Sequence, residues 1–191
     1  MIHSPIRISG ALKDSIDALG LVQYIVAPNA FHHLFLADAA AAWPTAQVWG
    51  AKGLQKKRKD VRFDGFLHAD DESPWSDEID DMYLAGAILD ETLFLHRRTR
   101  TLISSDLAVN QLKTDDWFTN SYVRVSGARD KFGHTLLIKM CFRDKVKSRA
   151  SVDRLLEWDF DRVILAHGEV LETGGHEAVT DSFKWLPAAK L

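Results

Sequence analysis

The stretch VQYIVAPNAFHHLFLADAAAAWP, residues 22–44, indicates the class of fold. Residues 22–27 are apolar and largely β-branched, as in a buried strand, and a Pro-Asn pair ends the run. Residues 34–42 are helix formers, and a second proline ends that segment. His32 and His33 therefore lie between the end of a strand and the start of a helix. Ligands bind at this position in α/β folds, so the stretch predicts an α/β protein with a site here.

Strands and helices alternate along the rest of the chain. Further strands are predicted at residues 1–8, 46–50, 92–96, 101–106 and 162–168. Helices are predicted at residues 9–20, across much of 114–158 with Thr114 as N-cap, and at residues 174–186. The apolar runs on either side of the charged turn RRTR predict a β-hairpin. The polar residues 53–75 show no strong period and predict a surface excursion. The pattern predicts a single α/β (α+β) domain over residues 1–191, with two mixed sheets between helices.

The composition restricts the partners and the compartment. A hydrophobic fraction of 46% with 27% charged residues is ordinary for a globular protein, and no apolar run is long enough to span a membrane. The net charge of −3, and the acidic residues that follow the KKRK run at 56–59, argue against a nucleic-acid partner. The single Cys141 excludes an internal disulfide, and its apolar neighbours predict a buried structural thiol. The N-terminus has no signal-peptide pattern, so the predicted location is cytoplasmic.

Metal-binding side chains follow three separate predicted strands. His32 and His33 follow the first, Asp106 follows the second and His167 follows the third. Imidazole and carboxylate groups are ligands of Zn²⁺ at about 2.0 to 2.2 Å, and a sheet edge brings distant residues together. A different interpretation assigns each residue a local role: Asp106 caps the next segment, and His167 is a hydrogen-bonded histidine in a tight His-Gly turn.

The same residues carry a resemblance to the metallo-β-lactamase fold superfamily. The stretches APN…HHLFL, RTLI…DL and LAHG are similar to those of a branch of uncharacterised bacterial metallo-hydrolase-like proteins of unknown function. The resemblance implies an αββα sandwich with metals at the sheet edges. Asp106 followed by Leu107 matches the superfamily's metal-bridging aspartate, and His167 with Gly168 matches its final His-Gly turn.

The first superfamily motif, His-any-His-any-Asp-His, is only partly matched. With His33 as its last residue, the motif's aspartate falls on His32, and its first two histidines fall on Pro28 and Ala30. The superfamily's next histidine, expected near residues 85–89, is also missing. The resemblance therefore implies that one metal position is lost.

The other metal position keeps a set of four donors, namely His32, His33, Asp106 and His167. This set suits one divalent metal, with zinc expected first and iron or manganese as alternatives. A closed four-coordinate site leaves no open position for a water nucleophile unless the coordination expands. Relatives also have further N-terminal strands, so the resemblance implies an N-terminally truncated copy. An unpaired sheet edge would favour a homodimer.

Three other residues are candidates for the second shell or the pocket wall: His3, Asn29 and Glu91. The first functional interpretation is a metal-dependent hydrolase that acts on a small-molecule ester, amide or thioester. The second is a catalytically silent member of the fold that binds a small molecule or a protein partner, with a structural metal or none. The third is redox or oxygen chemistry on iron.

Overall fold

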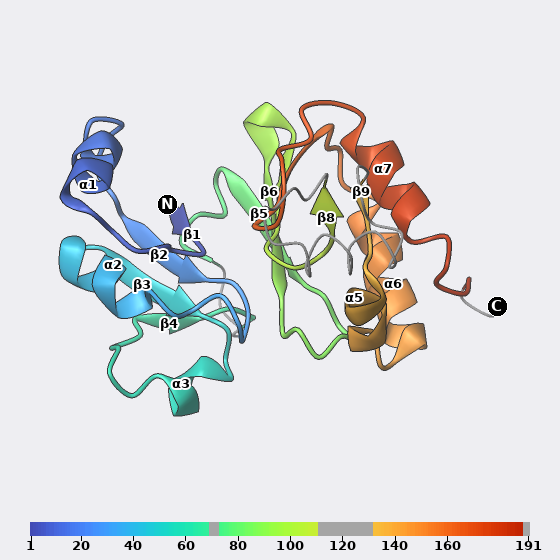
Figure 1. The fold of residues 1–191 in the computed structure, drawn as a ribbon, viewed down its shortest axis with the longest axis horizontal. Helices are drawn as coiled ribbons and strands as arrows, with labels where there is room; N and C mark the ends of the chain where they lie inside the picture. Colours follow the sequence, from blue (N-terminus) through green and yellow to red (C-terminus); the bar gives the residue numbers. More distant parts are fainter. Residues whose placement is uncertain (69–72, 111–131, 189–191) are drawn as a thin grey trace, which may run out of the picture. The chain divides into compact units, whose positions relative to one another are not determined.

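The computed structural model describes residues 1–68, 73–110 and 132–188 of the chain (Figure 1). The predicted helix start at Thr114 lies outside these residues. The chain divides into two compact units, Met1–Glu72 and Ser73–Leu191, each of which is described by itself. No described helix has the length and the apolar composition that a bilayer crossing needs.

Unit 1 contains a four-stranded sheet in which every described strand pair is parallel. The strands, in spatial order, are β1 (Ile2–His3), β2 (Tyr24–Ala27), β3 (Gln47–Gly50) and β4 (Gly65–Phe66), and the helices are α1 (Gly10–Asp17), α2 (Leu36–Ala42) and α3 (Leu54–Lys57). Each connection between neighbouring strands contains a helix, which is the usual crossover between parallel strands. The prediction of a mixed sheet is therefore wrong for this unit.

Local sequence explains most of unit 1. The Ser9 side chain accepts a hydrogen bond from the Leu12 amide and caps α1, as the sequence predicts. The apolar strand β2 and the alanine-rich helix α2 pack against each other and form the core with the buried Ile25 and Leu36. The interpretation of residues 53–75 as a surface excursion missed α3 and β4, because such short elements leave no period in the sequence.

Unit 2 contains a mixed sheet in the order β10-β7-β6-β5. Its strands are β5 (Ile79–Tyr83), β6 (Thr92–His96), β7 (Thr101–Ile103) and β10 (Arg162–Ile164). A second small sheet joins β8 (Val109–Asn110) to β9 (Phe132–Gly133). The helices are η1 (Arg97–Thr99), α5 (Leu136–Cys141), α6 (Lys145–Leu155) and α7 (Gly175–Ser182). The hairpin of β6 and β7 is antiparallel, which confirms the prediction from the RRTR turn. Strand β9 was not predicted.

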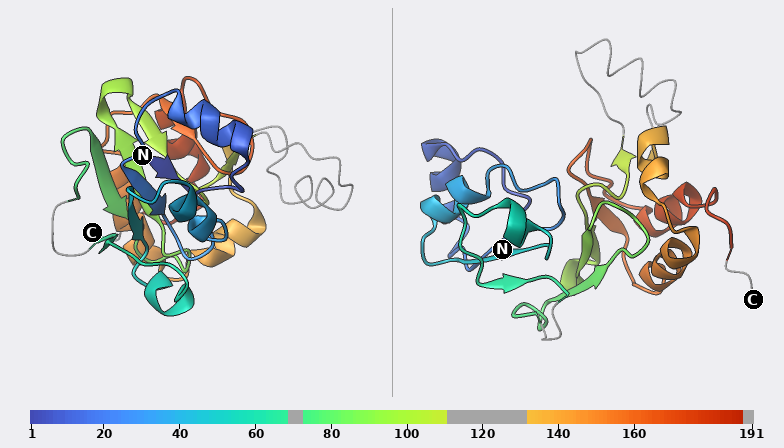
Figure 2. Two further views of the ribbon diagram at one scale, coloured as in Figure 1. Left: turned by 90° about the vertical axis from the view of Figure 1, so that its left-hand side faces the viewer. Right: turned by 90° about the horizontal axis from the view of Figure 1, so that it is seen from below.

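The arrangement of β7 and β10 positions the residues of interest. These strands are parallel neighbours, with Ile103 opposite Ile164, so the chain leaves the sheet at the same edge after each of them. Figure 2 shows the ribbon from two further directions, with α6 in orange and α7 in red. Strand β7 is shorter than the predicted 101–106, and its last predicted residues form a loop instead. Asp106 and His167 each lie three residues beyond the paired ends, which is why they can meet.

Candidate metal centre

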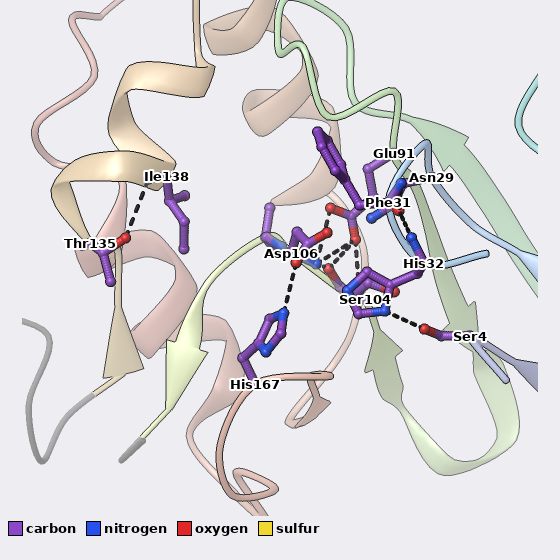
Figure 3. Close-up of polar contacts among 12 residues, drawn as sticks. Ser4, Asn29, Phe31, His32, Glu91, Ser104, Asp106, Thr135, Ile138 and His167 are labelled. Carbon is purple, nitrogen blue, oxygen red and sulfur yellow. Dashed lines mark hydrogen bonds and ion pairs between the residues drawn. The ribbon is translucent and has the colours of Figure 1, made fainter. Parts of the chain in front are cut away.

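Asp106 and His167 form a side-chain pair within unit 2. His167 Nε2 lies 3.0 Å from Asp106 Oδ1 (Figure 3). The Asp106 side chain is 16% exposed and that of His167 is 46% exposed, so the pair is accessible from solvent. Two donors at about 2.0 to 2.1 Å from a tetrahedral zinc ion are roughly 3.3 Å apart. The carboxylate and the imidazole are therefore close to the separation that a shared metal would require.

The electrostatics of this pair favour a protonated imidazole when no metal is bound. The hydrogen bond to Asp106 raises the pKa of His167 above its usual value of 6.5, while partial burial opposes the shift and the charges of Asp106 and Glu91 support it. A histidine with a raised pKa in the folded state stabilises that state fully below its unfolded pKa of about 6.5. This stabilisation is lost as the pH rises through the raised pKa.

In the metal-free protein, we expect the NMR titration midpoint of the His167 ring to lie above 6.5. In Asp106→Asn the midpoint should fall, because the hydrogen bond to a carboxylate and its charge are both lost. The measurement is the chemical shift of the His167 ring proton against pH in both proteins. A midpoint that Asp106→Asn leaves unchanged would show that the pair does not form in solution.

Glu91 binds the backbone that carries Asp106. The side chain is fully buried, and its Oε1 accepts hydrogen bonds from Ser104 Oγ at 2.6 Å, Ser105 N at 2.7 Å and Asp106 N at 3.1 Å (Figure 3). Burial, with a contribution from the Asp106 charge, raises the pKa of Glu91 to about 7, and these three hydrogen bonds oppose the shift. Glu91 is thus a buried neighbour of the Asp106 loop rather than part of an exposed pocket wall.

The buried Asn110 holds the backbone around His167. Its amide N–H donates to the His167 carbonyl at 3.1 Å, and its carbonyl accepts from Glu169 N at 2.9 Å. Its side-chain Nδ2 donates to the Glu169 carbonyl at 2.8 Å. Sequence reasoning missed Asn110 and Ser104, because nothing in the local pattern links either residue to partners so far away in the chain.

The candidates of unit 1 gather where β1 and β2 end. Asn29 is fully buried, and its Oδ1 accepts hydrogen bonds from Phe31 N at 2.9 Å and His32 N at 2.7 Å. His32 Nδ1 lies 2.5 Å from Ser4 Oγ. When Nδ1 donates to this hydroxyl, Nε2 carries the lone pair that a metal would need, as is usual for metal-binding histidines. Burial, followed by the charge of His32, lowers the pKa of His3 to about 3, so His3 is neutral.

His33 has different surroundings from its neighbour. It is 5% exposed, and its Nδ1 lies 3.2 Å from Arg58 Nη1. Arg58 also donates to the His33 carbonyl and forms an ion pair with Asp60. Since arginine can only donate, Nδ1 accepts and Nε2 carries the proton. Burial and the charges of Lys57 and Arg58 lower the pKa of His33. Its role as a ligand remains a prediction.

Within each unit, the structure brings sequence-predicted residues together. Asp106, His167 and Glu91 lie together in unit 2, and His3, Asn29 and His32 lie together in unit 1. Cys141 of α5 is only half-buried, whereas the sequence predicted a buried thiol, and its pKa is raised chiefly by this partial burial.

Comparison with known proteins identifies the family and the fold. A family model described as a domain of unknown function (DUF4336) matches residues 1–131 of the 191-residue chain. No curated protein matches the sequence. Similar solved structures include a metallo-β-lactamase from Hirschia baltica, with a TM-score of 0.60 and 9% identity over 99% of this chain and 81% of that chain.

Two further structures are informative. The metallo-β-lactamase FIM-1 from Pseudomonas aeruginosa, solved in a mono-zinc form, has a TM-score of 0.55 and 12% identity over 87% of this chain and 69% of that chain. The flavodiiron protein from Giardia intestinalis has a TM-score of 0.57 and 16% identity over 92% of this chain and 45% of that chain. At such identities the likeness shows the fold alone. The chain belongs to the DUF4336 family and has the mixed α/β fold of the metallo-β-lactamase type.

Proposed function

We propose that this protein is a metal-dependent hydrolase with one divalent metal per chain, which acts on a small-molecule ester, amide or thioester. The observation that carries the proposal is the pair of Asp106 Oδ1 and His167 Nε2, 3.0 Å apart at the ends of two parallel strands. A carboxylate and an imidazole in this arrangement suit zinc, and they also suit iron or manganese. The metallo-β-lactamase fold supports the proposal, because its members named above include a mono-zinc form and a flavodiiron protein.

His32 is the third donor in this proposal. When its Nδ1 donates to Ser4 Oγ, its Nε2 carries the lone pair that would bind the metal. His33 is a weaker candidate, because its Nδ1 faces the guanidinium of Arg58. Three protein donors would leave a fourth tetrahedral position open for water or substrate, as in catalytic zinc sites.

The protein's own residues have separate roles in the proposed chemistry. A bound divalent ion would polarise the substrate carbonyl and lower the pKa of a water molecule. Asp106 and His167 hold that ion, and deprotonation of His167 is a condition of binding. Because Asp106 raises the pKa of His167, binding is expected to weaken in mildly acidic solution.

The two adjacent histidines offer a matched test of the ligand set. We expect His32→Ala to weaken metal binding by more than about tenfold, since loss of a ligand should cost at least as much as loss of an outer-shell partner. His33→Ala should change the affinity little, because the His33 ring faces Arg58. The measurement is the Co²⁺ dissociation constant by chelator competition, with the melting temperature recorded for each variant. A larger loss in His33→Ala would assign the ligand to His33 and contradict the proposed set.

Turnover separates the hydrolase from a catalytically silent member of the fold. The metal-loaded protein and its Asp106→Ala variant are incubated with a panel of chromogenic esters, thioesters and amides. Hydrolysis that depends on both the metal and Asp106 supports the hydrolase. Metal binding without turnover on any of these substrates would instead favour the silent interpretation, in which the site binds a small molecule or a partner.

A further inference from the structure

We propose that Glu91 is the positioning residue of the metal site, and that it acts by fixing the backbone of Asp106. This inference rests on the proposed function, because it concerns the same site. A fully buried carboxylate would then have a measurable effect on metal affinity.

Packing alone does not explain a carboxylate at position 91, because an apolar side chain could fill the same buried space. It directly precedes β6, and its side chain is fully buried. A buried carboxyl group is unfavourable unless its oxygens are hydrogen-bonded. Within the described part of the chain, every hydrogen bond of this carboxylate comes from residues 104–106.

The contacts restrain the whole loop that follows β7. Two successive backbone amides, of Ser105 and Asp106, donate to Glu91, and the Ser104 hydroxyl donates as well. The same hydroxyl accepts from Leu107 N at 3.1 Å, so three consecutive residues bind the carboxylate and the fourth is held through Ser104. The backbone of Glu91 is itself fixed, since its carbonyl accepts from Leu84 N at 2.9 Å.

This arrangement determines the direction of the Asp106 side chain. The Asp106 amide donates to Glu91 Oε1 at 3.1 Å, which restrains the backbone from which the carboxylate reaches His167. Residues that orient metal ligands from outside the coordination sphere typically change metal affinity by about 10- to 100-fold when they are replaced. Glu91 does this through the main chain rather than through the ligand's side chain.

Two substitutions at Glu91 distinguish the effect of side-chain length on metal binding from the effect of side-chain charge. Glu91→Gln keeps an oxygen at Oε1 for the three hydrogen bonds made there and loses only the longer contact of Asp106 N with Oε2, at 3.2 Å, so metal affinity should change little. Glu91→Asp keeps the charge but is one methylene shorter, so the Co²⁺ dissociation constant should rise by about 10- to 100-fold. The Co²⁺ absorption spectrum of the Glu91→Gln variant should resemble that of the wild type. The spectrum of Glu91→Asp should differ, because the geometry of the ligands around the metal changes.

A control distinguishes positioning from general stability. Ser151→Ala removes another buried hydroxyl of unit 2, which accepts from Ala85 N at 3.0 Å, and should lower the melting temperature without changing the dissociation constant. Ser104→Ala removes one contact of the Glu91 network and should weaken Co²⁺ binding even if Glu91→Asp does not fold.

Two outcomes would overturn the inference, and they differ from failure of the proposed function. If Glu91→Asp or Ser104→Ala lowers the melting temperature with wild-type affinity and spectrum, Glu91 is merely structural. If Glu91→Gln weakens Co²⁺ binding as much as Glu91→Asp does, the charge of Glu91 matters rather than the length of its side chain, and the positioning role is wrong. A wild-type protein that binds no Co²⁺ would instead refute the proposed metal site itself.

Discussion

Replacing Gly168 with alanine is expected to destabilise the protein by at least about 3 kcal/mol and to displace His167. Gly168 has a φ of +109°, a conformation that side chains rarely adopt. A Cβ atom here would lie 1.8 Å from the carbonyl oxygen of Asn110. This oxygen cannot move freely, because it accepts from Glu169 N while Asn110 N donates to His167. The chain must therefore shift where it carries the proposed ligand.

Gly174→Ala is the matched control for this substitution. Gly174 also has a positive φ, +73°, but a Cβ atom at that position would meet nothing within 4 Å. Its replacement should cost only the backbone strain, roughly 1 kcal/mol. Urea denaturation followed by circular dichroism gives both free energies of unfolding. Equal losses in the two variants would mean that the Asn110 contact does not restrict Gly168.

The parts of the fold that sequence predicts are those with a local signal. The apolar run of β2, the Ser9 cap and the hairpin around RRTR each depend on neighbouring residues, and the structure confirms them. The parallel order of the first sheet depends on which strands meet after a crossover, and the pairing of β8 with β9 joins residues that are distant in the sequence. Neither leaves a periodic pattern.

The same distinction applies to the candidate site. Asp106 and His167 are recognisable because each follows an apolar strand and matches a short motif. The role of Glu91 cannot be recognised from the sequence, because its burial and its contact with Asp106 N arise only when β6 and β7 pair. Two adjacent histidines look equivalent in sequence, yet only the folded chain shows that Arg58 faces His33.

Asp106→Ala is expected to weaken metal binding by more than about 100-fold, because it removes a charged ligand rather than an outer-shell group. Its carboxylate is the partner of His167, 3.0 Å away. His96→Ala is the control, since this histidine also lies in unit 2 but its Nδ1 contacts Thr99 Oγ1 at 2.6 Å. It should retain metal like the wild type. Comparable losses in both variants would remove Asp106 from the ligand set.

The central claim is a single metal site that depends on Asp106. The most direct measurement is the metal content per chain of protein purified without chelator at about pH 8, because metal binding requires deprotonated ligands. The expected ratio is near one for the wild type and near zero for Asp106→Ala. A ratio near two, no metal in the wild type, or equal metal in both proteins would contradict the claim.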